Sequence, residues 1–192
     1  MTNTAIEIAP NSALLVIDVQ KGFDDAAFWG PRNNPAAEAN IAALMDAWQA
    51  AGRPVVLVQH ASLRPGSVLA AEHPGYALKD FVEERRYESL LVTKTVNSAF
   101  YGSPDLGEWL KAQGIGQLVV AGIQTNMCVE TTARMAGNLG YEVLVPLDAT
   151  HTFDLKGPDG VSLTADQLAT ATAVNLQGGG FARVVTTAEL LA

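Results

Sequence analysis

Six short runs of almost purely apolar residues recur along the chain, and they constrain its fold more than any other feature. Each run has the length of a β-strand and lacks polar alternation, which is typical of parallel strands buried on both faces. The expected strands are Ala13 to Val19, Pro54 to Gln59, Leu90 to Lys94, Gln117 to Ala121, Glu142 to Pro146 and Ala182 to Thr186.

Segments with helical spacing lie between these runs. Glycine follows each of them, as is common where a helix ends. Strand–helix alternation favours right-handed crossovers. It therefore predicts an α/β fold with a doubly wound, mostly parallel six-stranded sheet and helices on both faces, formed as one domain over residues 1–192. The expected helices are Pro35 to Ala51, Ser103 to Gln113, Asn126 to Leu139 and Thr164 to Leu176.

Composition argues against several classes of partner. The net charge is -8, whereas nucleic acids and anionic membranes attract clusters of Lys and Arg. No apolar run reaches the roughly 18 residues of a membrane span, and the first residues do not resemble a secretory signal. The single cysteine cannot form an internal disulfide. We therefore expect a cytoplasmic protein without a nucleic-acid or membrane partner.

Polar residues lie at the ends of two expected strands and shortly after a third. Asp18 and Lys94 each close an apolar run, and Cys128 lies where another run turns into a helix. If these strands are parallel neighbours, the three side chains meet at one edge of the sheet. A carboxylate can then deprotonate the thiol for attack on a carbonyl, and an ammonium stabilises both anions. Taken singly, each residue also fits a simpler interpretation: a solvated strand end, an exposed charge or a buried small side chain.

Three segments that hold these residues closely resemble the isochorismatase-like cysteine hydrolase family. This family includes nicotinamidases and carbamoyl-amide hydrolases on a Rossmann-like α/β sheet. The segments occur in the family's order along nearly the whole chain. They are LVIDVQKGF at residues 15–23, TKTVNSAF at residues 93–100 and GIQTNMCVETTAR at residues 122–134.

The resemblance implies an amidohydrolase in which Cys128 is the nucleophile, Asp18 the general base and Lys94 the third catalytic residue. It also implies a cis peptide between Ile123 and Gln124. The backbone N–H groups of Gln124 and Cys128 would then form an oxyanion hole.

Departures from relatives narrow the expected substrate. Nicotinamidases typically carry a metal-binding Asp-x-His after the second strand, and this chain lacks that pair. His60 and His73 remain as weak candidate ligands, so we expect no metal and no other cofactor. Siderophore-type isochorismatases cleave a vinyl ether and commonly lack the cysteine, so Cys128 favours an amide, ureido or lactam substrate. Vinyl ether hydrolase, nicotinamidase, thiol redox sensor and silent binding protein are the alternatives.

The long irregular segments Lys21 to Asn34 and Ala61 to Tyr87 are expected to wall the pocket. Residues 28–35 read either as a lid or as a turn in which Asn34 caps the next helix, and Asp154 to Leu163 reads as a turn. Aromatic candidates fit core or subunit packing equally well, and the resemblance implies a homodimer or homotetramer. The candidate substrate-binding residues are Phe23, Trp29, Asn97, Phe100, Tyr101, Gln124, Met127 and Phe153.

Overall fold

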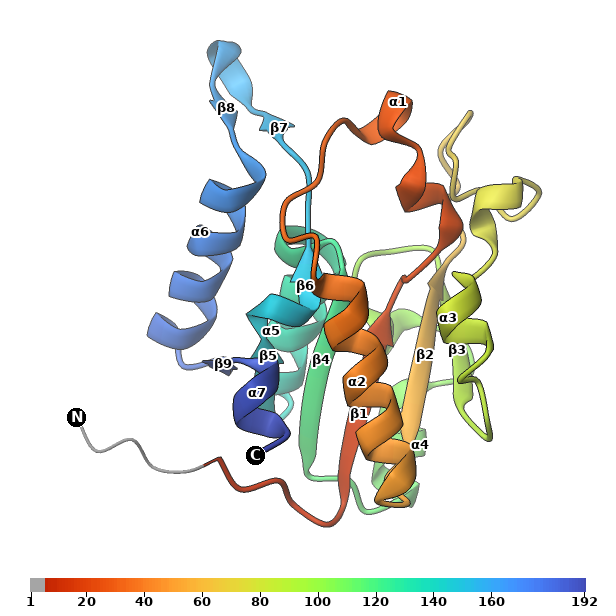
Figure 1. The fold of residues 1–192 in the computed structure, drawn as a ribbon, viewed down its shortest axis with the longest axis vertical. Coiled ribbons are helices and arrows are strands. Elements are labelled where there is room, and N and C mark those ends of the chain that lie inside the picture. The colour runs from red at the N-terminus through yellow and green to blue at the C-terminus, as the bar shows by residue number, and fades with distance from the viewer. Residues whose placement is uncertain (1–5) are drawn as a thin grey trace.

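The computed structural model describes residues 6–192 and shows a parallel β-sheet between two layers of helices (Figure 1). Its strands follow the order β3-β2-β1-β4-β5-β9, and the short strand β6 pairs with the end of β4. The predicted α/β class is confirmed, with β6 as a seventh strand that the sequence pattern did not indicate. The strands are β1 (Ser12–Ile17), β2 (Val55–His60), β3 (Leu90–Lys94), β4 (Gln117–Ile123), β5 (Glu142–Pro146), β6 (Thr150–His151) and β9 (Arg183–Val185).

Alternate residues of each strand enter two separate cores. Leu14 and Val16 of β1 pack on the side of α2 (Ala37–Ala50), where Ile41 and Trp48 are buried. Leu15 packs on the opposite side of the sheet, in a core that also holds Leu110 and Leu176 from two other helices. Because both faces of the sheet are covered, the strands read as continuous apolar runs. The helices are α1 (Ala26–Trp29), α2 (Ala37–Ala50), α3 (Asp80–Glu83), α4 (Leu106–Ala112), α5 (Glu130–Asn138), α6 (Ala165–Gly178) and α7 (Thr187–Leu190).

Several predicted boundaries were wrong near the edge where the site forms. β1 ends at Ile17 because Asp18 has a φ of 50°, in the left-handed region, and leaves the extended conformation. β4 continues to Ile123 because β6 pairs with its last residues. The predicted helix Asn126 to Leu139 begins instead as a π-helical turn over Thr125–Val129, which α5 then continues.

Two helix starts also differ from the prediction. The second predicted helix, α4, begins at Leu106 rather than at Ser103, and the Asp105 side chain there accepts the Glu108 N–H. Ser103-Pro104 lies before the helix in a cis peptide. Asn34 does not cap α2, since its side-chain amide donates to the backbone oxygens of Asp148 and Thr150. Asn34 thereby ties the segment before α2 to the region around β6.

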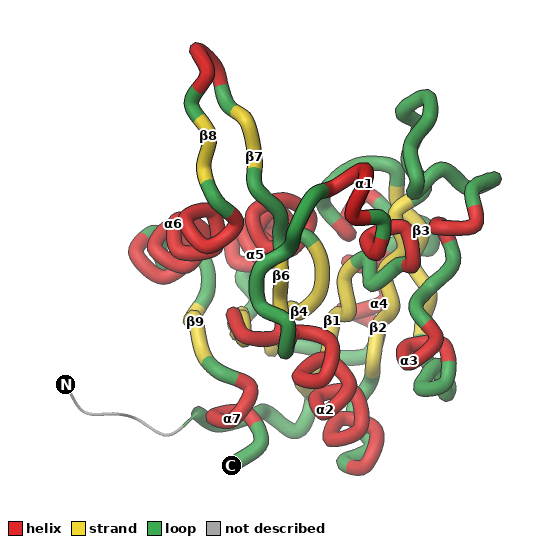
Figure 2. The backbone as a smooth tube through the Cα atoms, turned by 45° about the horizontal axis from the view of Figure 1, so that its top comes forward, coloured by secondary structure: helices red, strands yellow, loops and turns green. Residues whose placement is uncertain are grey.

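Residues 154–163 form more than the predicted turn. β7 (Leu155–Lys156) and β8 (Ser162–Leu163) pair as an antiparallel hairpin, and both views show this hairpin extending away from the sheet (Figures 1 and 2). Across residues 6–192, no helix is long and apolar enough to cross a membrane.

Candidate active site

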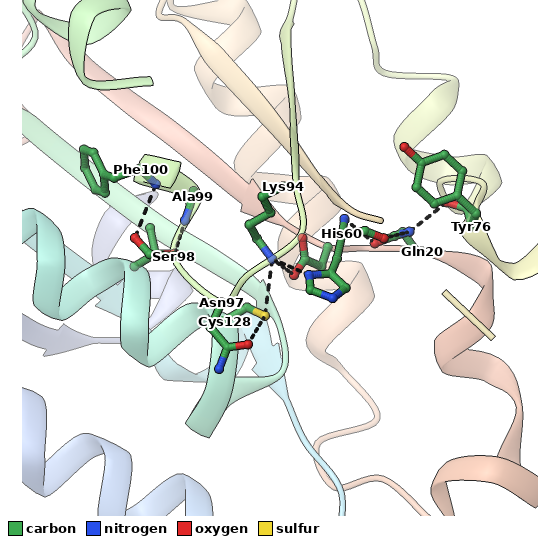
Figure 3. A network of polar contacts seen from close by, with 11 residues as sticks. Gln20, His60, Tyr76, Lys94, Asn97, Ser98, Ala99, Phe100 and Cys128 are labelled. Carbon is green, nitrogen blue, oxygen red and sulfur yellow. Dashed lines mark hydrogen bonds and ion pairs between the residues drawn. The ribbon is translucent and has the colours of Figure 1, made fainter. Parts of the chain in front are cut away.

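Asp18, Lys94 and Cys128 meet at the carboxyl edge of the sheet, although they leave it from separate strands. Asp18 follows β1, Lys94 ends β3, and Cys128 lies in the π-helical turn after β4. Lys94 Nζ lies 2.5 Å from Asp18 Oδ2 and 3.3 Å from Cys128 Sγ (Figure 3). The three strands are not all neighbours, because β2 lies between β1 and β3. The long lysine side chain spans that extra strand.

The Asp18–Lys94 pair is completely buried, with both side chains 0% exposed. Taking two charges out of water is costly, and a short, charge-assisted hydrogen bond offsets that cost. One carboxylate oxygen, Oδ2, is bound to the ammonium. The other, Oδ1, has no hydrogen-bond partner within residues 6–192, so it remains able to accept a proton.

Burial raises the pKa of the Cys128 thiol well above its usual range, and the nearby Asp18 carboxylate raises it further. The Lys94 ammonium acts in the opposite direction and lowers this pKa. Since burial and Asp18 dominate, the resting sulfur is a thiol that needs a base. Asp18 is therefore both the group that opposes a standing thiolate and a proton acceptor within 4.8 Å of the sulfur.

The turn that carries Cys128 depends on a glycine at the end of β4. Gly122 has a φ of 126°, and a Cβ atom there would lie 2.1 Å from the backbone oxygen of Ile17. Only glycine allows β4 to approach β1 this closely. One residue further along, the peptide bond between Ile123 and Gln124 is cis. Thr125 is buried, and its hydroxyl bonds the Thr150 hydroxyl at 2.8 Å, which joins the start of the turn to β6.

Asn97 is the predicted substrate-binding residue that lies beside the nucleophile. Its Oδ1 atom is 3.8 Å from Cys128 Sγ (Figure 3). The loop that carries Asn97 is held by a buried hydrogen bond from the Ala99 N–H to Thr132 Oγ1 on α5. Gln124 lies at the start of the π-helical turn, and the Thr152 hydroxyl lies 3.3 Å from its side-chain oxygen.

The aromatic candidates separate into two groups. Phe23, Trp29 and Phe153 stack on one another with ring centroids 5.0 to 6.1 Å apart, and Phe23 and Phe153 are nearly fully buried. Their burial favours the packing interpretation of this cluster. Phe100 stacks on Tyr141 in the opposite core, Met127 packs against that core, and Tyr101 is largely exposed.

The segment considered as a lid is held by several contacts. The Trp29 indole donates to the Gly22 carbonyl, and the Asn33 side chain accepts the Thr152 N–H. The Arg32 guanidinium pairs with Glu38, which also pairs with the buried Lys79. These contacts favour a structural role of residues 28–35 over a lid, although Asn34 does not supply the helix cap that the turn interpretation included.

One group of side chains within residues 6–192 has the composition of a metal site. Ligand atoms of Asp18, His60 and Cys128 all lie within 4.8 Å of one another. The Lys94 ammonium contacts all three residues, so a metal ion bound there would have to displace it. His73, the other histidine considered as a ligand, instead accepts the Gly75 N–H and caps a short helical turn.

His60 and Gln20 are part of the site, although their residue types and positions in the sequence predicted no catalytic role for them. His60 ends β2 directly beside Lys94 of β3, and its Nδ1 atom lies 3.2 Å from Lys94 Nζ. Gln20 is fully buried and binds the His60 backbone through both ends of its amide. The position of His60 at the end of an apolar run was the signal available in the sequence.

The known proteins that this chain resembles in sequence and in structure belong to one family. The family model described as "Isochorismatase domain" matches residues 12–189. A crystal structure of an isochorismatase-family protein from Chromobacterium violaceum superposes with a TM-score of 0.91 at 38% identity, covering 99% of this chain and 97% of that one.

Two relatives have named activities. Streptothricin hydrolase of Streptomyces noursei is 37% identical over 84% of this chain, which spans only 62% of that protein's length. Ureidoacrylate amidohydrolase RutB of Variovorax paradoxus is 32% identical, with 74% of this chain and 69% of RutB covered.

Proposed function

This chain belongs to the isochorismatase family of hydrolases, and we propose that it cleaves the C–N bond of a small amide, ureido or lactam substrate through a thioester on Cys128. A single observation carries the proposal. A buried ammonium contacts both a carboxylate with one free oxygen and the only thiol of the chain. This set contains a nucleophile, its base and a cation that stabilises both anions.

Acylation begins with a proton transfer inside the site. Cys128 gives its proton to Asp18, and the thiolate attacks the substrate carbonyl carbon to form a C–S bond. The negative charge that develops on the carbonyl oxygen is stabilised by the backbone N–H groups of Gln124 and Cys128. When the C–N bond breaks, protonated Asp18 gives its proton to the leaving nitrogen.

Deacylation uses the same carboxylate a second time. Asp18 takes a proton from water, the resulting hydroxide attacks the thioester carbonyl, and the C–S bond breaks. The thiolate then recovers the proton from Asp18. The balance is one amide and one water converted to one carboxylic acid and one amine. For a lactam both products remain in one molecule, which gains the mass of water.

Lys94 gives and takes no proton in this cycle. It remains an ammonium that stabilises whichever of the two partners is negative: the Asp18 carboxylate at rest and the Cys128 thiolate during attack. Such fixed charges in a buried site act more strongly than they do in water. The amide class of substrate is supported by the amidohydrolase among the relatives.

The test is a substrate panel assayed with the wild-type chain, Cys128→Ala and the size-matched Cys128→Ser. The panel contains primary amides including nicotinamide, ureido acids, lactams and a vinyl ether. Released ammonia and mass gain of the substrate are both measured, because a lactam releases nothing. We expect hydrolysis of at least one C–N substrate by the wild type and none by either variant.

An acyl adduct should also appear in the intact mass after rapid acid quenching, and it can only sit on Cys128 because the chain has one cysteine. Turnover by Cys128→Ala would contradict the proposal. Cleavage of only the vinyl ether would do the same, as would reversible oxidation of Cys128 by peroxide in a protein inactive on the entire panel.

A further inference from the structure

We propose that His60 is a positioning residue that accepts the third hydrogen of the Lys94 ammonium and thereby keeps that ammonium directed at Asp18 and Cys128. The inference deepens the function proposed above and rests on it for its catalytic meaning. The geometry itself involves only the resting protein. His60 reaches the reacting atoms through Lys94 and needs no contact with the substrate.

The Lys94 ammonium has as many hydrogen-bond donors as it has acceptors around it. An ammonium has three N–H donors and no acceptor. Lys94 Nζ has three acceptors around it: Asp18 Oδ2 at 2.5 Å, His60 Nδ1 at 3.2 Å and Cys128 Sγ at 3.3 Å (Figure 3). The lysine side chain is 0% exposed. A buried donor without a partner is costly, so each acceptor has a distinct share in fixing the ammonium.

The protonation of the imidazole ring agrees with this role. An ammonium can only donate, so His60 Nδ1 must be the unprotonated ring nitrogen. The Val96 backbone also hydrogen-bonds the His60 ring, and this contact favours a proton on the ring. The charged groups that face His60 are Lys94 from β3 and Asp18 from the end of β1, with the Cys128 thiol beside them. Burial, then Lys94, lower the pKa of His60, which keeps the ring a neutral acceptor.

The backbone of His60 is fixed independently of the ring. The His60 N–H donates to Gln20 Oε1 at 2.9 Å, and Gln20 Nε2 donates back to the His60 carbonyl at 3.1 Å. Gln20 Nε2 also donates to the Tyr76 carbonyl at 2.8 Å. Gln20 lies two residues after Asp18, so this clamp holds the end of β2 against the segment that carries the base. A change of the ring alone should therefore leave the strand in place.

The experiment follows the reactivity of Cys128 toward iodoacetamide, which needs no substrate. Intact-mass spectrometry counts the modification, and it reports one site because the chain has one cysteine. The rates are measured for wild type, His60→Leu, His60→Asn, Lys94→Met and the double variant His60→Leu/Lys94→Met. His73→Asn is the matched control, since His73 is exposed and caps a short turn. Thermal melting of each variant identifies the folded ones.

We expect His60→Leu to slow alkylation about tenfold, as for loss of one hydrogen bond to a charged group. Asn supplies an acceptor oxygen, so His60→Asn should restore part of the rate, and His73→Asn should match wild type. In the Lys94→Met background, His60→Leu should change the alkylation rate by less than about twofold, because the ammonium through which His60 acts on Cys128 is absent.

Equal effects of His60→Leu with and without Lys94 would overturn the proposal, since a purely structural role is additive. A wild-type rate in His60→Leu would overturn it as well. Neither result depends on amide hydrolysis. If the alkylation rates of the single and double variants follow these expectations but the protein hydrolyses no amide, the positioning role of His60 stands and the proposed function does not.

Discussion

Replacing Asp18 with Asn should make Cys128 more reactive toward an alkylating agent while it abolishes turnover. The reason is that the Asp18 carboxylate opposes the thiolate electrostatically and yet is its proton acceptor. Asn keeps the shape of the side chain and removes both properties. The Lys94 ammonium, no longer paired with a carboxylate, is then free to stabilise the sulfur anion.

The size of the effect follows from the geometry. Ligand atoms of Asp18 and Cys128 lie within 4.8 Å of each other. At that separation and an effective dielectric constant of about 20, two like charges repel by about 3.5 kcal/mol, a factor of several hundred in the thiolate population. A less basic thiolate is also a weaker nucleophile, with a Brønsted coefficient of about 0.5, so the rate gains about the square root of that factor. Alkylation should therefore accelerate by about tenfold or more.

The assay measures iodoacetamide labelling near neutral pH by intact mass, alongside hydrolysis of the substrate identified in the panel. Loss of a general base lowers turnover by about 10²- to 10⁴-fold. Asp46→Asn is the matched control, because Asp46 lies on α2, is half-exposed and pairs with Arg85. Slower alkylation in Asp18→Asn than in wild type would refute the electrostatic reasoning, and retained turnover would refute the base.

Two further predictions concern stability. His151 is fully buried, no residue from 6 to 192 hydrogen-bonds its ring, and burial lowers its pKa to about 3. In the unfolded chain the imidazole of His151 has a pKa near 6.5, so below that pH the unfolded state binds a proton that the folded state does not. The free energy of unfolding of wild type should therefore fall by about 2 kcal/mol between about pH 7 and pH 5. His151→Leu lacks the imidazole and should not show this part of the decrease. Urea unfolding at both pH values tests this, and parallel pH dependence of the two proteins would contradict it. Gly122→Ala should lower the free energy of unfolding by at least about 3 kcal/mol, because the new Cβ would overlap the Ile17 backbone. Gly116→Ala is the control and should be nearly neutral, since a Cβ there meets no neighbour within 4 Å. Equal unfolding curves for the two variants would argue against the close approach of β4 to β1.

The sequence alone determined the fold class, because a strand buried on both faces must be apolar along its whole length. The predicted bounds of β3 and β5 match the structure to the residue, and those of the other long strands agree to within two residues at each end. The polar residues after these runs indicated the edge of the sheet where a site should form. The predicted triad residues are indeed gathered there, and their catalytic roles remain predictions.

Local patterns failed where distant segments decide the conformation. The extension of β4 and the existence of β6 depend on each other, and neither is visible in its own few residues. Likewise Asn34, a good helix cap by residue type, is drawn to backbone oxygens 114 and 116 positions away. Such contacts compete with local preference and can override it.

The order of the strands, and with it the role of His60, was decided only by the tertiary structure. Hydropathy shows that a strand is buried but carries no information about its neighbours, so the sequence could not place β2 between β1 and β3. That placement sets His60 beside Lys94 and makes the lysine cross one strand to reach Asp18. The candidate catalytic residues could be recognised singly from the sequence. The hydrogen bonds that join them depend on distances between segments far apart in the chain.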